Sequence, residues 1–204
     1  LGESPGHEYS RTSNPTRSLL ADTLADLEDG AGAVITCSGM AAATTVAQAF
    51  AGPGALVAIP HDAYGGTWRL FDALARKRQL DLTVVDLADP DALAALWQRR
   101  PALVWVETPS NPLLRIVDVA ALSEAAHQAG ALVAVDNTFL SPALQRPIRL
   151  GADIVVHSTT KYLNGHADVL GGAVVGATSE IVDSLRWWVN CLGTPGAPFD
   201  AYQT

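Results

Sequence analysis

The sequence predicts an α/β protein in which helices cover both faces of a mostly parallel, seven-stranded sheet. Seven short apolar runs are separated by segments with helical periodicity along most of the 204 residues. Continuous apolar runs are typical of parallel strands buried on both faces, and their alternation with helices indicates βαβ crossovers. Apolar residues make up 49% of the chain and charged residues 17%, which is typical of a folded domain with a sizeable core.

The chain divides into a short arm and one large domain. Residues 1–15 are rich in Gly, Ser, Pro and Asn and have no periodicity, so we expect an extended arm. The large domain, 16–204, is expected to open with a helix that Thr16 caps and that runs to about Asp29. The predicted strands are 33–36, 55–59, 82–86, 102–107, 131–136, 153–157 and 172–176. The predicted helices between them are 39–51, 66–79, 90–99 and 117–129.

The C-terminal stretch is expected to start as a helix at Ser179 and to end in a Gly/Pro-rich turn. No closing element is recognised before Thr204, and the chain begins with Leu1 instead of Met. We therefore expect that residues are missing from both ends.

Composition narrows the classes of partner. A net charge of −8 argues against a nucleic-acid or anionic-membrane surface, and no apolar run approaches the roughly 20 residues needed to span a bilayer. Cys37 and Cys191 lie far apart without a CxxC motif, which fits a protein of the reducing cytoplasm. The five histidines show no metal-ligand spacing, so no metal site is expected.

Polar side chains follow several predicted strands, at the sheet edge where sites of α/β proteins lie. Asp136 ends the apolar run at 131–136, and Lys161 closes the run that follows the strand at 153–157. Ser158 and Thr160 alternate with Thr159, so an extended chain places both hydroxyls on one side. A carboxylate, an amine and hydroxyls are thus expected near one edge.

This set suits a cofactor with an aldehyde, a basic ring nitrogen and a phosphate, which is pyridoxal 5′-phosphate (PLP). Lys161 would bond to the aldehyde, Asp136 would keep the ring nitrogen protonated, and the hydroxyls would bind phosphate. At ~3 Å and an effective dielectric near 20, the carboxylate–pyridinium attraction is roughly 5 kcal/mol. The simpler interpretations are that Asp136 caps a helix and that the hydroxyls belong to a polar strand end.

Two further stretches fit the same cofactor. Gly39 and Met40 open a predicted helix, and N–H groups at a helix N-terminus bind phosphate. Tyr64 lies between a strand and a helix, where its ring could stack on the cofactor and its hydroxyl handle protons. Taken singly, these are an ordinary helix start and a loop tyrosine.

Two rival motifs are dismissed. The run 158–161 satisfies the S-x-x-K spacing of β-lactamases, but their Ser-Asp-Asn and Lys-Thr-Gly elements are absent. Gly30-Ala31-Gly32 resembles the start of a dinucleotide loop, yet Ile35 replaces the third glycine and the run precedes a strand instead of following it.

Together these stretches resemble the Cys/Met-metabolism family of PLP-dependent enzymes, which has the fold type I. The matching stretches occur in family order over nearly the whole chain, at 9–17, 38–40, 64–67, 107–112, 136–139 and 157–166. The resemblance implies the three-layer large domain of this fold, with the C-terminal small domain outside this chain. The arginine that binds the substrate α-carboxylate would lie in that missing domain.

The resemblance also implies roles for single residues. Lys161 would bind the cofactor and serve as the mobile acid and base, Asp136 would pair with the pyridine nitrogen, and Tyr64 would stack on the ring. The amides of Gly39 and Met40, together with Ser158 and Thr160, would hold the phosphate. These roles agree with those inferred from the residues themselves.

Four residues receive a role from the resemblance alone. Tyr9 and Arg11 would reach the phosphate of a neighbouring subunit, which implies active sites shared within a homotetramer built as a dimer of dimers. Asn111 would lie near the ring's phenolic oxygen, and Arg69, with Tyr64, would border an amino-acid substrate.

Within the family, local details favour one activity. Gly66 stands where methionine γ-lyases carry a cysteine, and the run 161–168 is similar to the cystathionine γ-synthase and γ-lyase branch. The stretches 187–190 and 199–202 are most similar to bacterial γ-synthases. The implied reaction joins O-succinyl-L-homoserine and L-cysteine into L-cystathionine. The alternatives are a γ-lyase that cleaves cystathionine to cysteine, 2-oxobutyrate and ammonia, and a degenerate, non-enzymatic PLP-fold binding protein.

Overall fold

A computed structural model describes residues 6–204, so residues 1–5 of the expected arm lie outside the described part. The strands are β1 (Gly32–Thr36), β2 (Leu56–Pro60), β3 (Asp81–Val85), β4 (Leu103–Glu107), β5 (Leu132–Asp136), β6 (Ile154–His157) and β7 (Gly172–Gly176). The helices are α1 (Pro15–Glu28), α2 (Gly39–Phe50), α3 (Gly65–Arg76), α4 (Pro90–Gln98), α5 (Val119–Ala129), α6 (Ser141–Leu144), η1 (Pro147–Leu150), α7 (Ser179–Leu192) and α8 (Pro198–Gln203). All seven predicted strands are confirmed, with bounds that shift by one residue at most.

The strands form a single sheet in the order β1-β7-β6-β5-β4-β2-β3. From β6 to β3 each neighbouring pair is parallel, whereas β7 is antiparallel to both β6 and β1. The reason lies in the connection from β6 to β7, which contains no crossover helix, and a loop without a crossover returns the chain in the opposite direction. The predicted mostly parallel sheet is confirmed.

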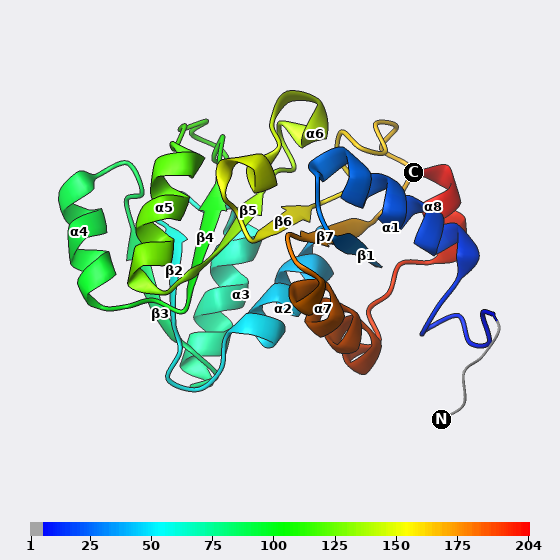
Figure 1. The fold of residues 1–204 in the computed structure, drawn as a ribbon, viewed down its shortest axis with the longest axis horizontal. Coiled ribbons are helices and arrows are strands. Elements are labelled where there is room, and N and C mark those ends of the chain that lie inside the picture. The colour runs from blue at the N-terminus through cyan, green and yellow to red at the C-terminus, as the bar shows by residue number, and fades with distance from the viewer. Residues whose placement is uncertain (1–5) are drawn as a thin grey trace.

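Helices cover both faces of the sheet, as Figure 1 shows. One face packs against α2, α3 and α7, and the other packs against α1, α4 and α5. Strand β4 shows how the sequence produces this: Trp105 contacts Phe71 of α3, whereas Val104 and Val106 belong to the cluster on the α5 side. Alternate residues of a buried strand thus serve two apolar cores.

Local differences from the predicted elements have identifiable causes. Asn14, not Thr16, caps α1, because its side chain accepts hydrogen bonds from the N–H groups of Thr16 and Arg17 while Pro15 occupies the first helical position. The prediction also missed α6, η1 and α8, which at four to six residues are too short for a helical period to show. The C-terminal turn therefore leads into α8, which packs against α1.

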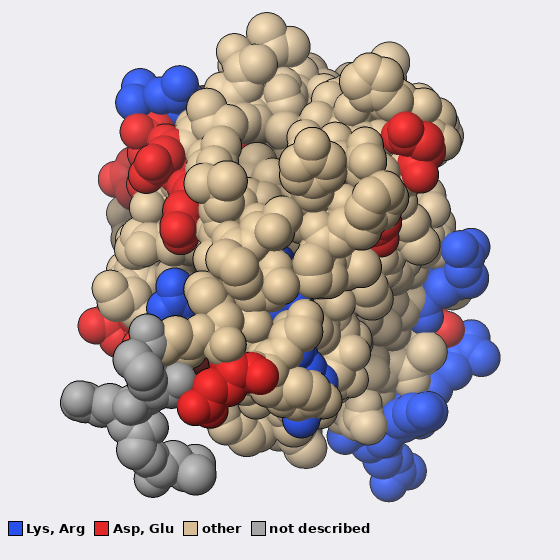
Figure 2. Space-filling model, turned by 90° about the vertical axis from the view of Figure 1, so that its right-hand side faces the viewer, with Lys and Arg blue, Asp and Glu red and all other residues tan. Residues whose placement is uncertain are grey.

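One end of the molecule combines α1, α7 and α8 with the outermost strand β1 (Figure 1). Figure 2 views the molecule from this side and shows a broad uncharged surface, with charged groups mainly towards its margins. Several large apolar side chains of these helices are exposed, namely Leu19, Trp187, Phe199 and Tyr202. An uncharged surface of this kind is typical of a protein–protein contact.

Candidate active site

A cavity opens at the carboxyl ends of the parallel strands, where the sequence placed the site. It collects segments that follow β1, β2, β4, β5 and β6, together with Leu170 ahead of β7. Among the predicted site residues, it is lined by Gly39, Met40, Tyr64, Asn111, Asp136, Ser158, Thr160 and Lys161. These residues span more than half of the chain in sequence, and the sheet brings them to one place.

The start of α2 forms the anion-binding side of this cavity. The Ser38 hydroxyl caps α2 by accepting the Ala41 N–H at 3.0 Å, which leaves the N–H groups of Gly39 and Met40 without partners inside the helix. A Cβ added at Gly39 would lie 2.7 Å from the Ser158 Cβ. Only glycine therefore lets the helix start approach Ser158 this closely, and the resulting cradle suits a phosphate.

The run after β6 completes the cradle with alternating side chains. Thr159 is buried, whereas Ser158 and Thr160 line the cavity, as predicted. The backbone is not extended as expected, because residues 159–161 form a turn that the Lys161 N–H closes on the Ser158 carbonyl. The Thr138 hydroxyl accepts the Ser158 N–H at 2.8 Å, and the Thr160 hydroxyl accepts the Gly171 N–H at 3.0 Å. Each segment of the cradle is thereby fixed to a neighbouring loop.

Asp136 ends β5 and is half-buried at the cavity. Burial raises the pKa of its carboxyl, and hydrogen bonds from Thr138 together with the charge of His157 lower it. Thr138 N–H donates to Oδ1 at 3.0 Å. Asp136 takes part in none of the ion pairs among residues 6–204, so a pyridinium would give this carboxylate a direct ion-pair partner.

Tyr64 and Lys161 complete the set. The Tyr64 side chain lines the cavity from the start of α3 and stays half exposed. Lys161 is also exposed, and it is presented by a compact turn in which its N–H donates to Ser158 O and its carbonyl accepts from Gly165 N–H. An amine, a carboxylate, an aromatic ring and a helix N-terminus in one cavity fit the chemical groups of PLP.

Three predicted residues lie away from the cavity lining. Arg11 stacks on the Tyr9 ring at 5.2 Å and donates to the Asn190 carbonyl at 2.6 Å, beside the C-terminal end of α7. Arg69 is exposed on α3. The roles of these residues at a neighbour's phosphate and at the substrate stay predictions.

The sequence analysis assigned no role to Glu107, which lines the cavity at the end of β4. Its Oε2 accepts the Tyr64 N–H at 2.6 Å, and its Oε1 accepts the Trp105 indole N–H at 3.1 Å. Glu107 pairs in register with Asp136 on β5. The signal was present in the sequence, because β4 and β5 both end an apolar run with an acidic residue.

The pKa of Glu107 is raised to about 7. Burial is the main cause and the nearby charge of Asp136 is the second, and together they outweigh the hydrogen bonds from Tyr64, Trp105 and Thr67, which act to lower the pKa. Below its ordinary pKa near 4.5, the carboxyl is protonated in both the folded and the unfolded chain. As the pH rises towards 7 only the unfolded chain loses the proton, so the free energy of unfolding falls by up to about 3 kcal/mol.

Replacing Glu107 by Gln should remove this loss in the cofactor-free protein. The stability difference between Glu107→Gln and wild type should shift in favour of the variant by about 2–3 kcal/mol between pH 5 and pH 8. Urea unfolding at the two pH values measures it, with the exposed Glu124→Gln as the matched control. A difference that does not change with pH would contradict the raised pKa.

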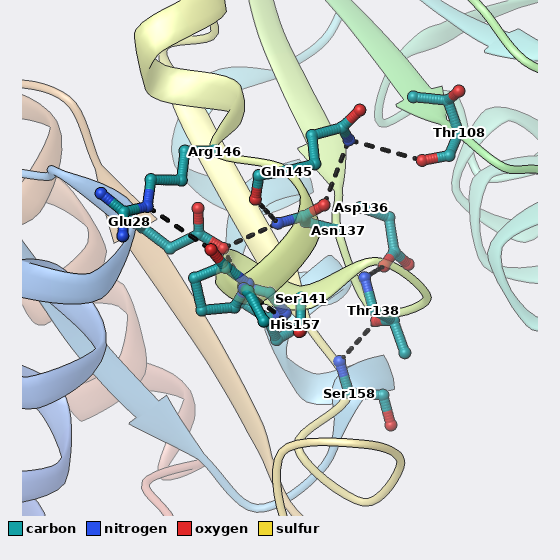
Figure 3. Close-up of polar contacts among 12 residues, drawn as sticks. Glu28, Thr108, Asp136, Asn137, Thr138, Ser141, Gln145, Arg146, His157 and Ser158 are labelled. Atoms are coloured by element: carbon teal, nitrogen blue, oxygen red, sulfur yellow. Dashed lines mark hydrogen bonds and ion pairs between the residues drawn. The ribbon is translucent and has the colours of Figure 1, made fainter.

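A polar network that includes Glu28, Asn137 and His157 lies at the ends of β5 and β6, as Figure 3 shows. Glu28 of α1 and His157 of β6 are fully buried, and Oε1 of Glu28 lies 2.6 Å from Nε2 of His157. The Asn137 side-chain amide donates to the same oxygen at 2.8 Å. Because Asn137 follows Asp136 and His157 precedes Ser158, this network holds the two strand ends that carry the site.

Within residues 6–204, no group of three or more His, Cys, Asp or Glu side chains could hold a metal ion. In the same part of the chain, no helix is long and apolar enough to cross a membrane.

Comparison with known proteins agrees with this geometry. A cystathionine γ-synthase of Escherichia coli is 52% identical over 99% of this chain and 52% of its own length. The crystal structure of a cystathionine γ-synthase from Xanthomonas oryzae, in complex with aminoacrylate and cysteine, superposes with a TM-score of 0.97 at 55% identity, covering all of this chain and 52% of that one. A cystathionine γ-lyase from Micromonospora echinospora reaches 0.94 at 43% identity, over 99% of this chain and 53% of its own.

The chain thus spans about half the length of these relatives. The Cys/Met metabolism PLP-dependent enzyme family model matches residues 1–204. The cavity described above carries the groups that this cofactor needs. The chain belongs to the Cys/Met metabolism family of PLP-dependent enzymes.

Proposed function

We propose that the full-length protein is a cystathionine γ-synthase, which joins O-succinyl-L-homoserine and L-cysteine into L-cystathionine and succinate. The observation that carries the proposal is the meeting of Lys161, Asp136 and Tyr64 with the N-terminus of α2 in one cavity. The names of the relatives support the choice within the family, since the most similar sequence and structure given above are both γ-synthases.

Each residue has a task in this proposal. PLP, when bound, supplies an electron sink for the substrate's carbon atoms. Asp136 keeps a proton on the ring nitrogen, and the Tyr64 ring covers one side of the cavity. The Lys161 amine attaches the cofactor and then moves protons at the substrate's Cα. The leaving γ-succinate takes the electron pair of its C–O bond, and the cysteine thiolate forms the new C–S bond at Cγ.

The second candidate is a γ-lyase, because a relative with that name has the same fold at 43% identity. Gly66 bears on a third activity, that of methionine γ-lyases with their cysteine at this position. A Cβ here would lie 2.5 Å from the Tyr64 ring and 2.8 Å from the Met40 sulfur. The present arrangement of Tyr64 thus depends on the absence of a side chain at position 66.

One assay separates the two candidates. The full-length enzyme given O-succinyl-L-homoserine and cysteine should form cystathionine and succinate in equal amounts, and without cysteine it should release 2-oxobutyrate and ammonia more slowly. Chromatography of the products measures both. Rapid cleavage of cystathionine together with poor use of the succinyl ester would favour the γ-lyase.

We also propose that the full-length protein is a cytoplasmic homotetramer with shared active sites. The uncharged surface of α1, α7 and α8 (Figure 2) supports an interface, and Tyr9 and Arg11 lie exposed next to it. The free cysteines, Cys37 and Cys191, fit a reducing compartment.

The shared site can be tested with hybrid oligomers. If Arg11 binds the phosphate of a neighbouring subunit, mixing Arg11→Ala and Lys161→Ala subunits should restore part of the activity that each variant lacks on its own. Hybrids as inactive as both parents would contradict a shared site.

A further inference from the structure

Helix α3 begins without a capping side chain of its own. Its N-cap residue is Tyr64, with φ −47° and ψ 133°, and the Tyr64 side chain makes no capping hydrogen bond. The hydrogen-bond partner of the Tyr64 N–H comes instead from strand β4, where the Glu107 carboxylate accepts it at 2.6 Å. A carboxylate at a helix N-terminus is also favoured by the helix dipole. Glu107 therefore fulfils the role that a Glu or Gln at the third helical position has in a capping box, where its side chain accepts the N–H of the N-cap residue.

The position of this carboxylate is fixed from several sides. Glu107 is only 5% exposed, and the buried Trp105 indole holds its second oxygen. Thr67, in the first turn of α3, also donates to it. The cap is thus rigid, and the backbone from which the Tyr64 ring projects is rigid with it.

We propose that Glu107 is a positioning residue whose ionised carboxylate caps α3 through the Tyr64 amide and thereby holds the Tyr64 ring in place for the cofactor. This inference rests on the proposed function, since it takes Tyr64 to stack on bound PLP. Glu107 acts through Tyr64 and not through contact with the reacting atoms.

The ionisation of Glu107 depends on whether Asp136 is paired with a positively charged ring nitrogen. Asp136 faces Glu107 from β5, and its negative charge helps to raise the pKa of Glu107 to about 7. Three other charged or titratable side chains belong to the surrounding elements. Lys161 lines the same cavity, the charge of His157 on β6 lowers the pKa of Asp136, and Asp62 on the loop after β2 accepts a hydrogen bond from the Ser110 hydroxyl. A cationic ring nitrogen on Asp136 offsets the repulsion, so cofactor binding should release a proton from Glu107, and affinity should rise from pH 6 to pH 8.

A double-mutant cycle tests the inference in the cofactor-free, full-length protein. Equilibrium dialysis with PLP at pH 6, 7 and 8 gives dissociation constants for wild type, Glu107→Gln, Tyr64→Ala and the double variant. At pH 8, Glu107→Gln should weaken binding about fivefold, as loss of a helix cap does. At pH 6, where wild-type Glu107 is mostly protonated, the difference should nearly vanish.

In the Tyr64→Ala background, Glu107→Gln should have no further effect, because the group that Glu107 positions is gone. Additive effects of the two substitutions, or a wild-type pH profile in Glu107→Gln, would overturn the inference. Glu124→Gln, on the exposed side of α5, is the matched control and should bind like wild type. Failure of wild type to bind PLP at any pH would instead overturn the proposed function, so the two failures are distinguishable.

A second variant keeps the test decisive if Glu107→Gln does not fold. Trp105→Phe removes one hydrogen bond to the ionised carboxylate and leaves the Tyr64 N–H in place. The pKa of Glu107 should then rise further, and the pH at which PLP affinity increases should move upward with it. An unchanged midpoint would count against Glu107 as the titrating cap.

Discussion

Lys161→Ala in the full-length protein should lose the visible absorbance of a lysine-bound cofactor and reduce turnover by roughly 10³-fold or more. The same amine attaches the cofactor and moves the substrate's proton in the proposed mechanism, so a single substitution removes both contributions. The exposed position of Lys161 at the cavity gives this amine access to cofactor and substrate. Absorbance spectra and steady-state kinetics measure the two losses.

The chain offers a matched control for this prediction. Apart from Lys161, the sequence contains one lysine, Lys77, at the C-terminal end of α3. Lys77→Ala should keep both the colour and the turnover of wild type. Borohydride reduction followed by peptide mapping should place the cofactor on Lys161. A label on any other lysine of the full-length protein would refute the assignment.

The second large effect concerns stability. His157→Leu should lower the free energy of unfolding by about 3–5 kcal/mol, because it leaves the fully buried Glu28 carboxylate without its closest partner. Replacing both residues, as in Glu28→Met with His157→Leu, should cost less than the single change, since no buried charge then lacks a partner. Urea unfolding of the cofactor-free protein measures both variants.

An exposed ion pair provides the comparison. Arg186 and Asp183 on α7 are 3.4 Å apart with both side chains largely exposed, so Arg186→Ala should change stability by less than about 1 kcal/mol. If His157→Leu were as mild as Arg186→Ala, or the double variant less stable than the single one, the Glu28–His157 pair would not have the predicted importance.

The sequence predicted the strands and the location of the site for one physical reason. In a parallel sheet, every buried strand delivers its next residues to the same edge, so Asp136 and Lys161 could be placed together without knowing the strand order. The antiparallel entry of β7 was not predicted, because strand direction depends on the connection and not on the apolar run. Asn14 was overlooked although an Asn before Pro at the first helical position is a strong capping signal.

Glu107 shows where sequence reasoning ends. An acidic residue at a strand end indicates that its carboxylate needs a partner, but the partner lies 43 residues away at the start of α3. The Glu28–His157 pair is separated by 129 residues and likewise has no local pattern. Such contacts are set by packing of whole elements, which a single sequence does not specify.

The close approach of Gly39 and Ser158 has a consequence for the order of events during folding. The two residues follow β1 and β6, and the sheet inserts β7 between these strands, where Gly172 lets the backbone pass the Ser38 carbonyl without a clash. The phosphate cradle therefore cannot form until β7, which lies 140 residues after β1 in the sequence, has joined the two halves of the sheet. Cofactor binding should therefore be a late step of folding. Bound PLP should then oppose separation of β1, β7 and β6, because at a concentration one hundred times its dissociation constant it adds about 2.7 kcal/mol to the free energy of unfolding.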